Sequence, residues 1–446
     1  MDAEIAAPQC AEPGLVETAI TGLTHDGRGV GRTEGKALFV HGALPGERVT
    51  ARLYRRHRRY DEAEIRQVIT ASPHRVAARC AHVARCGGCA LQHLDPAQQI
   101  EFKQRQVLDD LQRIGNVTPD EVAAPLTGPQ WGYRYKARLS VRRVEKMGRV
   151  LVGFREHVGR WVADVEHCHI LHPAIGERIG ALAERLGDLE IAAQIPQIEV
   201  ACDAQRRILI VRHLAPLGAA DREKLARFGA EHGIEFWLQA AGPDSVQPLA
   251  GEARPLSYRV GEPPVELHFS PAQFTQINPA VNRRMVAQAL DWLEPAAGDE
   301  VLDLFCGIGN FALPFAARGA RVTGVEGAAD VVARANQNAL LNALAEQARF
   351  HPFDLRLDPG REPWFGPAGK VILDPPRSGA LEVIPWLAAT GAATVLYISC
   401  QPASLARDAG ELVHRHGYRL ARIGVADLFP HTAHIETMAL FRLAGR

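Results

Sequence analysis

The sequence carries no excess of charge, because 51 Lys and Arg residues are balanced by 51 Asp and Glu residues. This balance excludes attraction of an anionic partner by the molecule as a whole, so such a partner must meet local basic patches. Long apolar runs are also missing, and no stretch reaches membrane-spanning length. The first twenty residues contain four acidic side chains and no basic start. We therefore expect neither a secretion signal nor contact with a membrane.

Cysteine is scarce as well, with 8 residues in a chain of 446. This low density excludes a disulfide framework and indicates a reducing, cytoplasmic compartment. Hydrophobic residues make up 47% of the chain and charged residues 23%, which is typical of globular proteins. The length predicts roughly two to four domains.

The N-terminal region alternates short apolar runs with glycine turns from residue 14 to residue 70, the pattern of a small β-barrel. Its second half concentrates positive charge in Arg48, Arg52, Arg55, Arg56, Arg58 and Arg59. These arginines form either a solvated face or a surface for single-stranded nucleic acid. The segment resembles a TRAM domain, a barrel of the oligonucleotide-binding type found on RNA-modifying enzymes, and we expect it to span residues 13–72.

A central domain is expected over residues 73–270, and it opens with three cysteines separated by five and then two residues: Cys80, Cys86 and Cys89. Such thiolates suit either zinc or an iron-sulfur cluster, and the spacing does not decide between them. For the fourth ligand we favour Cys168, which lies in a polar, loop-like stretch. Cys10 and Cys202 are weaker candidates.

Two further features belong to this central region. A helix is predicted over residues 95–114, capped by Asp95 and ended by Gly115. The strand-like stretch 131–161 then combines basic side chains with Trp131, Tyr133 and Tyr135. These rings either stack on unpaired RNA bases or pack against one another across strands. Residues 173–270 show no chemical motif and are interpreted as scaffold.

The third domain is expected over residues 271–446, where strands and helices alternate as in a doubly wound sheet. Its first long helix begins at Asn278-Pro279 and ends near Leu293. A buried strand and a glycine loop follow at residues 300–311, without the third glycine of a dinucleotide fingerprint. Asp303 and Glu326 match the acidic residues of S-adenosylmethionine sites, with Glu326 accepting from ribose hydroxyls and Asp303 ordering the loop.

Two later strands also end in acidic residues. Asp354 follows the third strand, where an adenine amine could donate to it. Asp374-Pro-Pro-Arg377 follows the fourth. An aromatic residue in place of Arg377 would indicate methylation of an adenine amino group, so we expect another target atom.

The next strand ends in Cys400, at the rim where open sheets bind substrates. A buried structural thiol is the plainer interpretation for a cysteine in an apolar run, and we retain it for Cys306. A thiolate at Cys400 could instead add to carbon 6 of a pyrimidine and activate carbon 5 for methylation. That chemistry requires a base, and Glu436 offers one, with His431 and His434 nearby. A plain strand-surface glutamate is the alternative for Glu436.

Taken together, these motifs resemble the RNA uracil-5-methyltransferases over nearly the whole chain. The resemblance implies a multidomain α/β fold with an OB-like barrel, a central α+β domain and a C-terminal Rossmann-like methyltransferase. It implies a [4Fe-4S] cluster on Cys80, Cys86, Cys89 and Cys168, with Cys400 as nucleophile and Glu436 as base. It also implies S-adenosylmethionine contacts from Gln276, Phe305, Asn310, Glu326, Asp354 and Asp374. The implied substrate is a uridine in a single-stranded loop of 23S ribosomal RNA, bound by a monomeric enzyme.

Three rival hypotheses remain at this point. A methyltransferase for the T-loop uridine of transfer RNA would share the chemistry, but we expect that type to lack the barrel and the cysteines. A radical methylthiotransferase would also join a TRAM barrel to a cluster, but with cysteine gaps of three and two. A cluster-bearing RNA-binding protein without catalysis would leave Cys400 and Glu436 unexplained.

Overall fold

The computed structural model describes residues 14–445, so Cys10 and residue 13 of the expected barrel lie outside the described residues. The described chain forms two compact units. The first consists of residues 14–84, 88–99 and 431–433, and the second of residues 85–87, 100–430 and 434–445. The three-domain division expected from the sequence remains a prediction. Among the described residues, no helix has both the length and the apolar character needed to cross a membrane.

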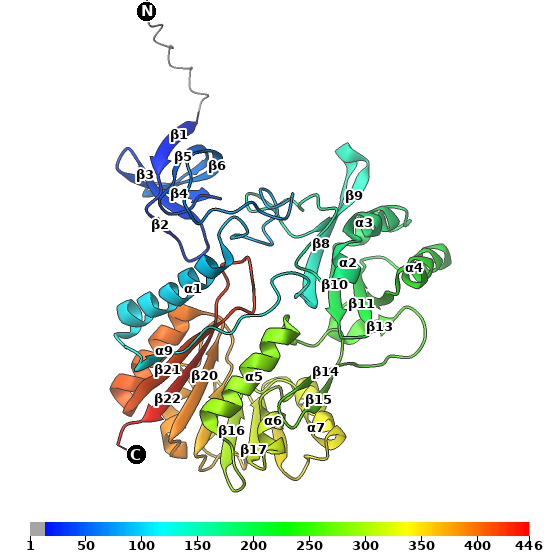
Figure 1. Cartoon of the computed structure of the whole chain (residues 1–446). Helices are drawn as coiled ribbons and strands as arrows, with labels where there is room; N and C mark the ends of the chain where they lie inside the picture. Colours follow the sequence, from blue (N-terminus) through cyan, green and yellow to red (C-terminus); the bar gives the residue numbers. More distant parts are fainter. Residues whose placement is uncertain (1–13, 446) are drawn as a thin grey trace, which may run out of the picture. The chain divides into compact units, whose positions relative to one another are not determined.

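The first unit contains a six-stranded sheet with the order β1-β5-β6-β4-β3-β2 (Figure 1). Its strands are β1 (Leu15–Ala19), β2 (Gly22–Leu23), β3 (Gly29–Thr33), β4 (Lys36–His41), β5 (Arg48–Arg56) and β6 (Tyr60–Thr70). A small apolar core includes Leu38, Val40 and Val49. Part of the expected basic face is neutralised, because Arg52 pairs with Glu64 and Arg48 with Glu17.

The second unit contains a six-stranded sheet with the order β13-β12-β11-β10-β8-β9. Its strands are β8 (Lys136–Val144), β9 (Arg149–Gly153), β10 (Gln197–Cys202), β11 (Arg207–Arg212), β12 (Glu235–Gln239) and β13 (Val246–Pro248). The accompanying helices are α2 (Pro173–Gly176), α3 (Ile179–Gly187) and α4 (Ala219–His232). Apolar side chains of α3 and α4 pack on this sheet, so most of the stretch interpreted as scaffold forms one core. Single 3-10 turns occur at Glu145–Met147, Ala192–Gln194 and Pro243–Ser245.

A second sheet of this unit has eight strands in the order β18-β17-β16-β19-β20-β22-β21-β7. They are β7 (Glu121–Val122), β16 (Glu300–Leu304), β17 (Arg321–Glu326), β18 (Ala348–Pro352), β19 (Lys370–Leu373), β20 (Thr394–Ser399), β21 (Tyr418–Ala426) and β22 (Glu436–Leu443). The helices around it are α5 (Pro279–Leu293), α6 (Ala312–Ala317), α7 (Ala329–Leu341), α8 (Ile384–Leu387) and α9 (Pro402–His416), with a 3-10 turn at Ala388–Thr390. A separate hairpin is formed by β14 (Leu256–Val260) and β15 (Val265–Phe269).

Both faces of the eight-stranded sheet are buried, because successive strand residues point to opposite sides. On β20, Leu396 and Ile398 belong to the core shared with α5, α6 and α7. Val395 and Tyr397 belong to the core shared with α8 and α9. This two-sided burial explains the continuous apolar strands of the sequence and confirms the doubly wound sheet that the sequence predicts.

The helix predicted over residues 95–114 is confirmed as α1 (Pro96–Asp110), followed by a π-helical turn at Leu111–Gly115. Asp95 caps it by accepting a hydrogen bond of 2.9 Å from the amide of Ala97. The predicted cap of α5 is also confirmed, since Asn278 accepts from the amide of Val281 at 3.3 Å. Both helices thus begin at the side-chain acceptors that the sequence indicates.

A buried ion pair ties α1 to the eight-stranded sheet. Lys103 is fully buried, and its Nζ lies 2.7 Å from Oδ1 of Asp427 and 3.0 Å from the carbonyl oxygen of Phe429. Removing one partner of such a pair would leave an uncompensated charge in the interior. The pair therefore fixes the segment that leads from β21 toward Glu436.

We expect Lys103→Met to lower the free energy of unfolding by about 3–5 kcal/mol, because it leaves the Asp427 carboxylate buried without its cation. The double variant Lys103→Met/Asp427→Leu should recover most of this loss. Arg105→Met is the matched control, since Arg105 forms an exposed pair with Glu101 on the same helix and should cost less than about 1 kcal/mol. Urea denaturation of the full chain measures all three, and equal losses for Lys103→Met and Arg105→Met would contradict the assignment.

Candidate active site

The candidate site lies where the strand ends of the eight-stranded sheet converge. Strands β18, β17, β16, β19 and β20 are parallel, so their carboxyl ends share one edge. Cys400 directly follows β20, and Asp374 directly follows β19. Strand β22 is antiparallel to β20 and therefore begins at this same edge, with Glu436 as its first residue. The topology thus brings together three of the sequence-predicted residues.

The pairing of β20 with β22 sets the spacing of the two residues expected to carry out catalysis. Ser399 pairs with Thr437, so Cys400 and Glu436 stand at the next position along adjacent strands. Opposite residues of an antiparallel pair have Cα atoms about 5 Å apart. Cys400 is half-buried, whereas the Glu436 side chain is only 4% exposed. A ring placed at this edge would lie within reach of both side chains.

Burial controls the protonation of both groups. It raises the pKa of Glu436 well above its ordinary value, and the neighbouring Asp374 carboxylate raises it further. The pKa of the Cys400 thiol is also raised, first by burial and then by Glu436 and Asp374, while Arg377 opposes the shift. The thiolate is therefore disfavoured until positive charge enters the site.

The glycine loop after β16 is shaped for close approach of a ligand. Phe305 adopts a φ of +63°, a left-handed conformation that a non-glycine residue holds only under constraint. Gly307 has a φ of +53°, and a Cβ added there would meet nothing within 4 Å. The Glu326 carboxylate orders this loop by accepting from the amides of Gly307 at 3.3 Å and Gly327 at 2.7 Å.

Negative charge concentrates beneath this loop. Asp303 is completely buried, and within residues 14–445 its carboxylate oxygens make no hydrogen bond of good geometry, although the nearby Ala312 amide favours the ionised form. Burial, followed by the charge of Asp374, raises the pKa of Asp303 well above its ordinary value. Burial and Glu326 raise the pKa of Asp374 to about 7. Such a group of carboxyls stabilises a cation in preference to a neutral or anionic ligand.

The other residues expected to contact the cofactor differ in burial and in the partners that their side chains already have. Asp354 lies in an exposed ion pair with Arg356, 2.7 Å away, and this hydrogen bond lowers the Asp354 pKa to about 2. The amide group of Asn310 is held by Asn282 and by the hydroxyl of Tyr258. Gln276 lies half-buried in the segment before α5.

Helix α9 holds the segment that follows β19, Asp374-Pro-Pro-Arg377-Ser-Gly379. Oδ2 of Asp408 accepts from the hydroxyl of Tyr397 and from the amide of Ala380, both at 2.7 Å. Gly379 has a φ of +86°, and a Cβ there would lie 2.5 Å from Asp408. Glycine is therefore required, and the loop presents Arg377 within electrostatic reach of Cys400.

The four cysteines expected to hold a cluster are divided between the units. Cys80 and Cys89 belong to the first, and Cys86 and Cys168 to the second, where both lie beside the core of the six-stranded sheet. Within each unit taken by itself, no three described His, Cys, Asp or Glu side chains form a metal site. No disulfide is recorded among the seven described cysteines.

Three supporting residues were missed from the sequence. Lys103 anchors Asp427, the Tyr133 hydroxyl donates to the carbonyl of Pro430 at 2.9 Å, and Lys136 donates to the carbonyl of Gln273. The first two fix the segment before Glu436, and the third fixes the segment before Gln276. Tyr133 and Lys136 carried a signal only as members of the basic, aromatic stretch, which was interpreted as a possible RNA surface. Lys103 carried none.

Comparison with known proteins yields two family matches. The family model described as tRNA (Uracil-5-)-methyltransferase matches residues 257–349 and 367–443. The TRAM domain model matches residues 16–65. In fold, the chain is similar to the Pyrococcus abyssi tRNA (uracil-54, C5)-methyltransferase in complex with S-adenosyl-L-homocysteine. The TM-score is 0.71 and the identity 22%, and the match covers 96% of this chain and all of that one. These matches define a methyltransferase.

Full-length relatives narrow the class further. The chain is 51% identical over 429 residues to the 23S rRNA (uracil(1939)-C(5))-methyltransferase RlmD of Stenotrophomonas maltophilia, which covers 95% of this chain and 96% of that protein. The protein with the same name from Methylococcus capsulatus is 47% identical over 436 residues, covering 97% and 98%. The chain belongs to the RNA uracil-5-methyltransferase family, as the sequence motifs predicted.

We expect alkylation of Cys400 by iodoacetamide to reach half its maximal rate at a pH above the ordinary thiol pKa of about 8.5, because only the thiolate reacts. Replacing Arg377 with glutamine should move this midpoint upward by up to about one pH unit, since a favourable charge is lost. Arg356→Gln is the control and should leave it unchanged. Mass spectrometry of the Cys400 peptide follows the reaction, and a midpoint below that of a free thiol would contradict the assigned electrostatics.

Proposed function

We propose that this enzyme transfers a methyl group from S-adenosylmethionine to carbon 5 of a uridine in 23S ribosomal RNA, giving 5-methyluridine. The single observation that carries the proposal is that Cys400, directly after β20, and Glu436, at the start of β22, meet at the sheet edge where the glycine loop also lies. The names of the full-length relatives support the substrate and indicate the uridine numbered 1939. We place the enzyme, as a monomer, in the reducing cytoplasm, in keeping with its low cysteine content.

The residues present fit the cofactor. The open space over Gly307 admits a ligand to the backbone, and the buried carboxylate of Asp303 lies in an acidic environment that suits a sulfonium cation. Glu326 would accept from the ribose hydroxyls, Asp374 and Asp354 would contact the adenosine part, and Gln276, Phe305 and Asn310 would complete the site. When bound, S-adenosylmethionine supplies an electrophilic methyl group.

Cys400 begins the reaction by adding its thiolate to carbon 6 of the uracil ring. The new bond pushes an electron pair to carbon 5, which forms a bond to the methyl carbon as the sulfur–methyl bond breaks. Arg377 favours the thiolate that this step requires. The strand-end position of Cys400 leaves the thiol half-exposed and therefore accessible to a base flipped out of its loop.

Glu436 completes the reaction by removing the proton that remains on carbon 5. The electron pair of that C–H bond restores the ring double bond and expels the Cys400 thiolate from carbon 6. Burial makes the ionised Glu436 carboxylate a stronger base than a glutamate in water. Lys103 and Tyr133 maintain the position of this residue by fixing the segment that precedes it.

We also propose that Cys80, Cys86, Cys89 and Cys168 hold a [4Fe-4S] cluster. The backbone beside Cys86 is tightly packed, because a Cβ on Gly87 would lie 2.7 Å from the carbonyl oxygen of Arg155. A Cβ on Gly176 would likewise lie 2.2 Å from the carbonyl oxygen of Cys168. Both cysteine loops are thus tightly fixed. A cluster there would brace the surrounding loops.

Methylation of transfer RNA is the second candidate. We had expected transfer-RNA enzymes to lack the N-terminal domain, but the Pyrococcus abyssi enzyme is similar to 96% of this chain. Domain architecture therefore does not separate the two substrates. The ribosomal substrate is favoured by the relatives near 50% identity, whose names specify 23S rRNA.

Cys400→Ala should abolish methylation of a 23S rRNA fragment while retaining S-adenosylhomocysteine binding, because the thiolate acts only on the base. Glu436→Gln should instead transfer the methyl group and then accumulate a covalent protein–RNA adduct, visible as a denaturation-resistant gel shift. Cys306→Ala is the control and should remain active. Methylation by Cys400→Ala would refute the mechanism, and faster methylation of a transfer RNA T-loop would reverse the substrate assignment.

Anaerobically purified protein should be brown and contain iron and acid-labile sulfide in equal amounts, because four thiolates would hold a [4Fe-4S] cluster. Cys168→Ala should lose most of the iron. Cys202→Ala is the matched control, since burial raises the pKa of that thiol to about 12 and leaves it a poor ligand. A colourless protein that contains zinc would show that the cluster assignment is wrong.

A further inference from the structure

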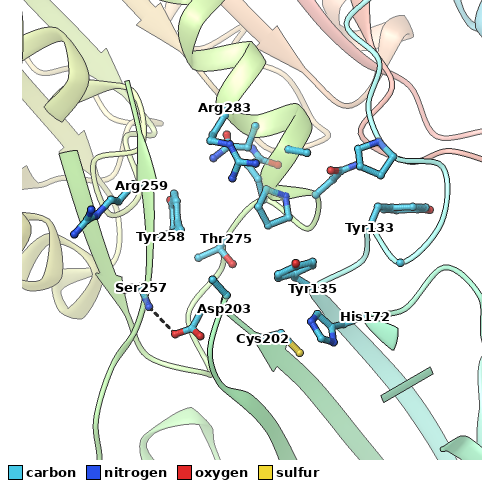
Figure 2. A pocket seen from close by; sticks show the side chains of 18 of the residues that line it. Tyr133, Tyr135, His172, Cys202, Asp203, Ser257, Tyr258, Arg259, Thr275 and Arg283 are labelled. Carbon is cyan, nitrogen blue, oxygen red and sulfur yellow. Dashed lines mark hydrogen bonds between the residues drawn. The ribbon is translucent and has the colours of Figure 1, made fainter. Parts of the chain in front are cut away.

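A cavity of about 1020 Å³ lies between the six-stranded sheet of the second unit and the start of α5. Of the residues expected to take part in catalysis or cofactor binding, Gln276 alone is among those that line this cavity. Its walls supply several rings: Trp131, Tyr133, Tyr135, His172 and Tyr258. Figure 2 shows Arg283 approaching from α5 and Tyr258 from β14, facing Tyr135 and His172. The volume exceeds what one nucleotide requires.

The chemistry of the cavity is that of a site for an unpaired nucleotide. Tyr135 and Tyr258 are only half-buried. Each already meets a neighbouring ring edge-to-face, His172 and Phe269 respectively, so a base would stack on a ring that is held in place. Arg259 is paired with Glu266 at 2.9 Å. Arg283 is exposed, and its guanidinium forms no ion pair with any described residue. A ring-lined cavity with one available cation matches a base joined to a phosphate.

The cavity also shares a wall with the proposed cofactor site. Tyr258 donates its hydroxyl hydrogen bond to Oδ1 of Asn310 at 3.0 Å. Asn282, another lining residue, exchanges two hydrogen bonds with the Asn310 amide, at 2.8 and 3.0 Å. Lining residue Gln276 is itself an expected cofactor contact. A ligand in the cavity would therefore lie beside the proposed cofactor site.

We propose that this cavity binds a second unpaired nucleotide of the substrate RNA, next to the methylated uridine, with its base against Tyr135 and its phosphate at Arg283. The proposal rests on the proposed function, because it requires an RNA substrate with the target uridine in a loop. It adds a point of sequence selection separate from the chemical step. A loop that cannot place a second base in the cavity would bind weakly even with a uridine at the right position.

The test measures affinity of catalytically inactive Cys400→Ala protein for a 23S rRNA loop fragment, with abasic sites introduced one at a time beside the uridine. Tyr135→Leu should weaken binding of the intact fragment about 10-fold, the scale of one base–aromatic stack. On the fragment that lacks the base proposed to enter the cavity, Tyr135→Leu should cause no further loss of affinity. Tyr135→Phe keeps the ring and should bind like the parent protein.

Arg283→Gln should reduce the slope of log affinity against log salt by about 0.7, the value of one phosphate contact to a single strand. Arg284→Gln is the matched control, because Arg284 is the next residue of α5 but donates to the carbonyl of Thr127 outside the cavity. Arg283→Gln and Arg284→Gln should both bind S-adenosylhomocysteine normally. The same binding measurement on Tyr135→Leu shows whether that variant is folded.

Two results would overturn the proposal. Equal losses for Tyr135→Leu on every abasic fragment, with an unchanged salt slope for Arg283→Gln, would show that no base enters the cavity. Weakened S-adenosylhomocysteine binding by Arg283→Gln with normal RNA affinity would assign the cavity to the cofactor. Neither result depends on the chemical step. Failure of the proposed function would appear differently, as methylation by Cys400→Ala, and would leave the affinities for the RNA fragments unchanged.

Discussion

The antiparallel pairing of β22 with β20 is the constraint on which the candidate site depends. Parallel strands alone would bring Asp374 and Cys400 to the sheet edge, but a reversed strand is needed to begin there with Glu436. A slip of one residue in this register would turn the Glu436 side chain to the opposite face of the sheet. The ion pair of Lys103 with Asp427 stabilises the incoming segment, so it supports the register from a distance.

The electrostatics of the edge follow from this convergence. Asp303, Asp374 and Glu436 are each buried enough for their pKa values to rise, and each is affected by a neighbouring carboxyl. Without a cation, the same field also disfavours the Cys400 thiolate. A sulfonium ion in the site would relieve both effects, since positive charge favours every ionised group around it. Cofactor binding and activation of the nucleophile and base are therefore physically linked.

The sequence predicted the features that depend on local pattern. Short apolar strands followed by Asp374 and Cys400 placed these residues at a sheet rim, and Asn278-Pro279 marked the start of α5. The sequence did not reveal which distant side chains meet. Nothing in the sequence indicated that Lys103 is buried, because its partner Asp427 lies more than three hundred residues away. The Asn310 amide was expected to be available, but residues from β14 and α5 hold it.

The position of Asn310 has a consequence for substrate selection. Its amide is oriented by Tyr258 and Asn282, and both of these residues also line the cavity. A base bound in the cavity would contact groups that orient a cofactor contact, so binding of the RNA and binding of the cofactor should be coupled. Such coupling is reciprocal by thermodynamic necessity. Selection of the correct loop and preparation of the methyl donor would then share one structural element, the side-chain layer between β14 and α5.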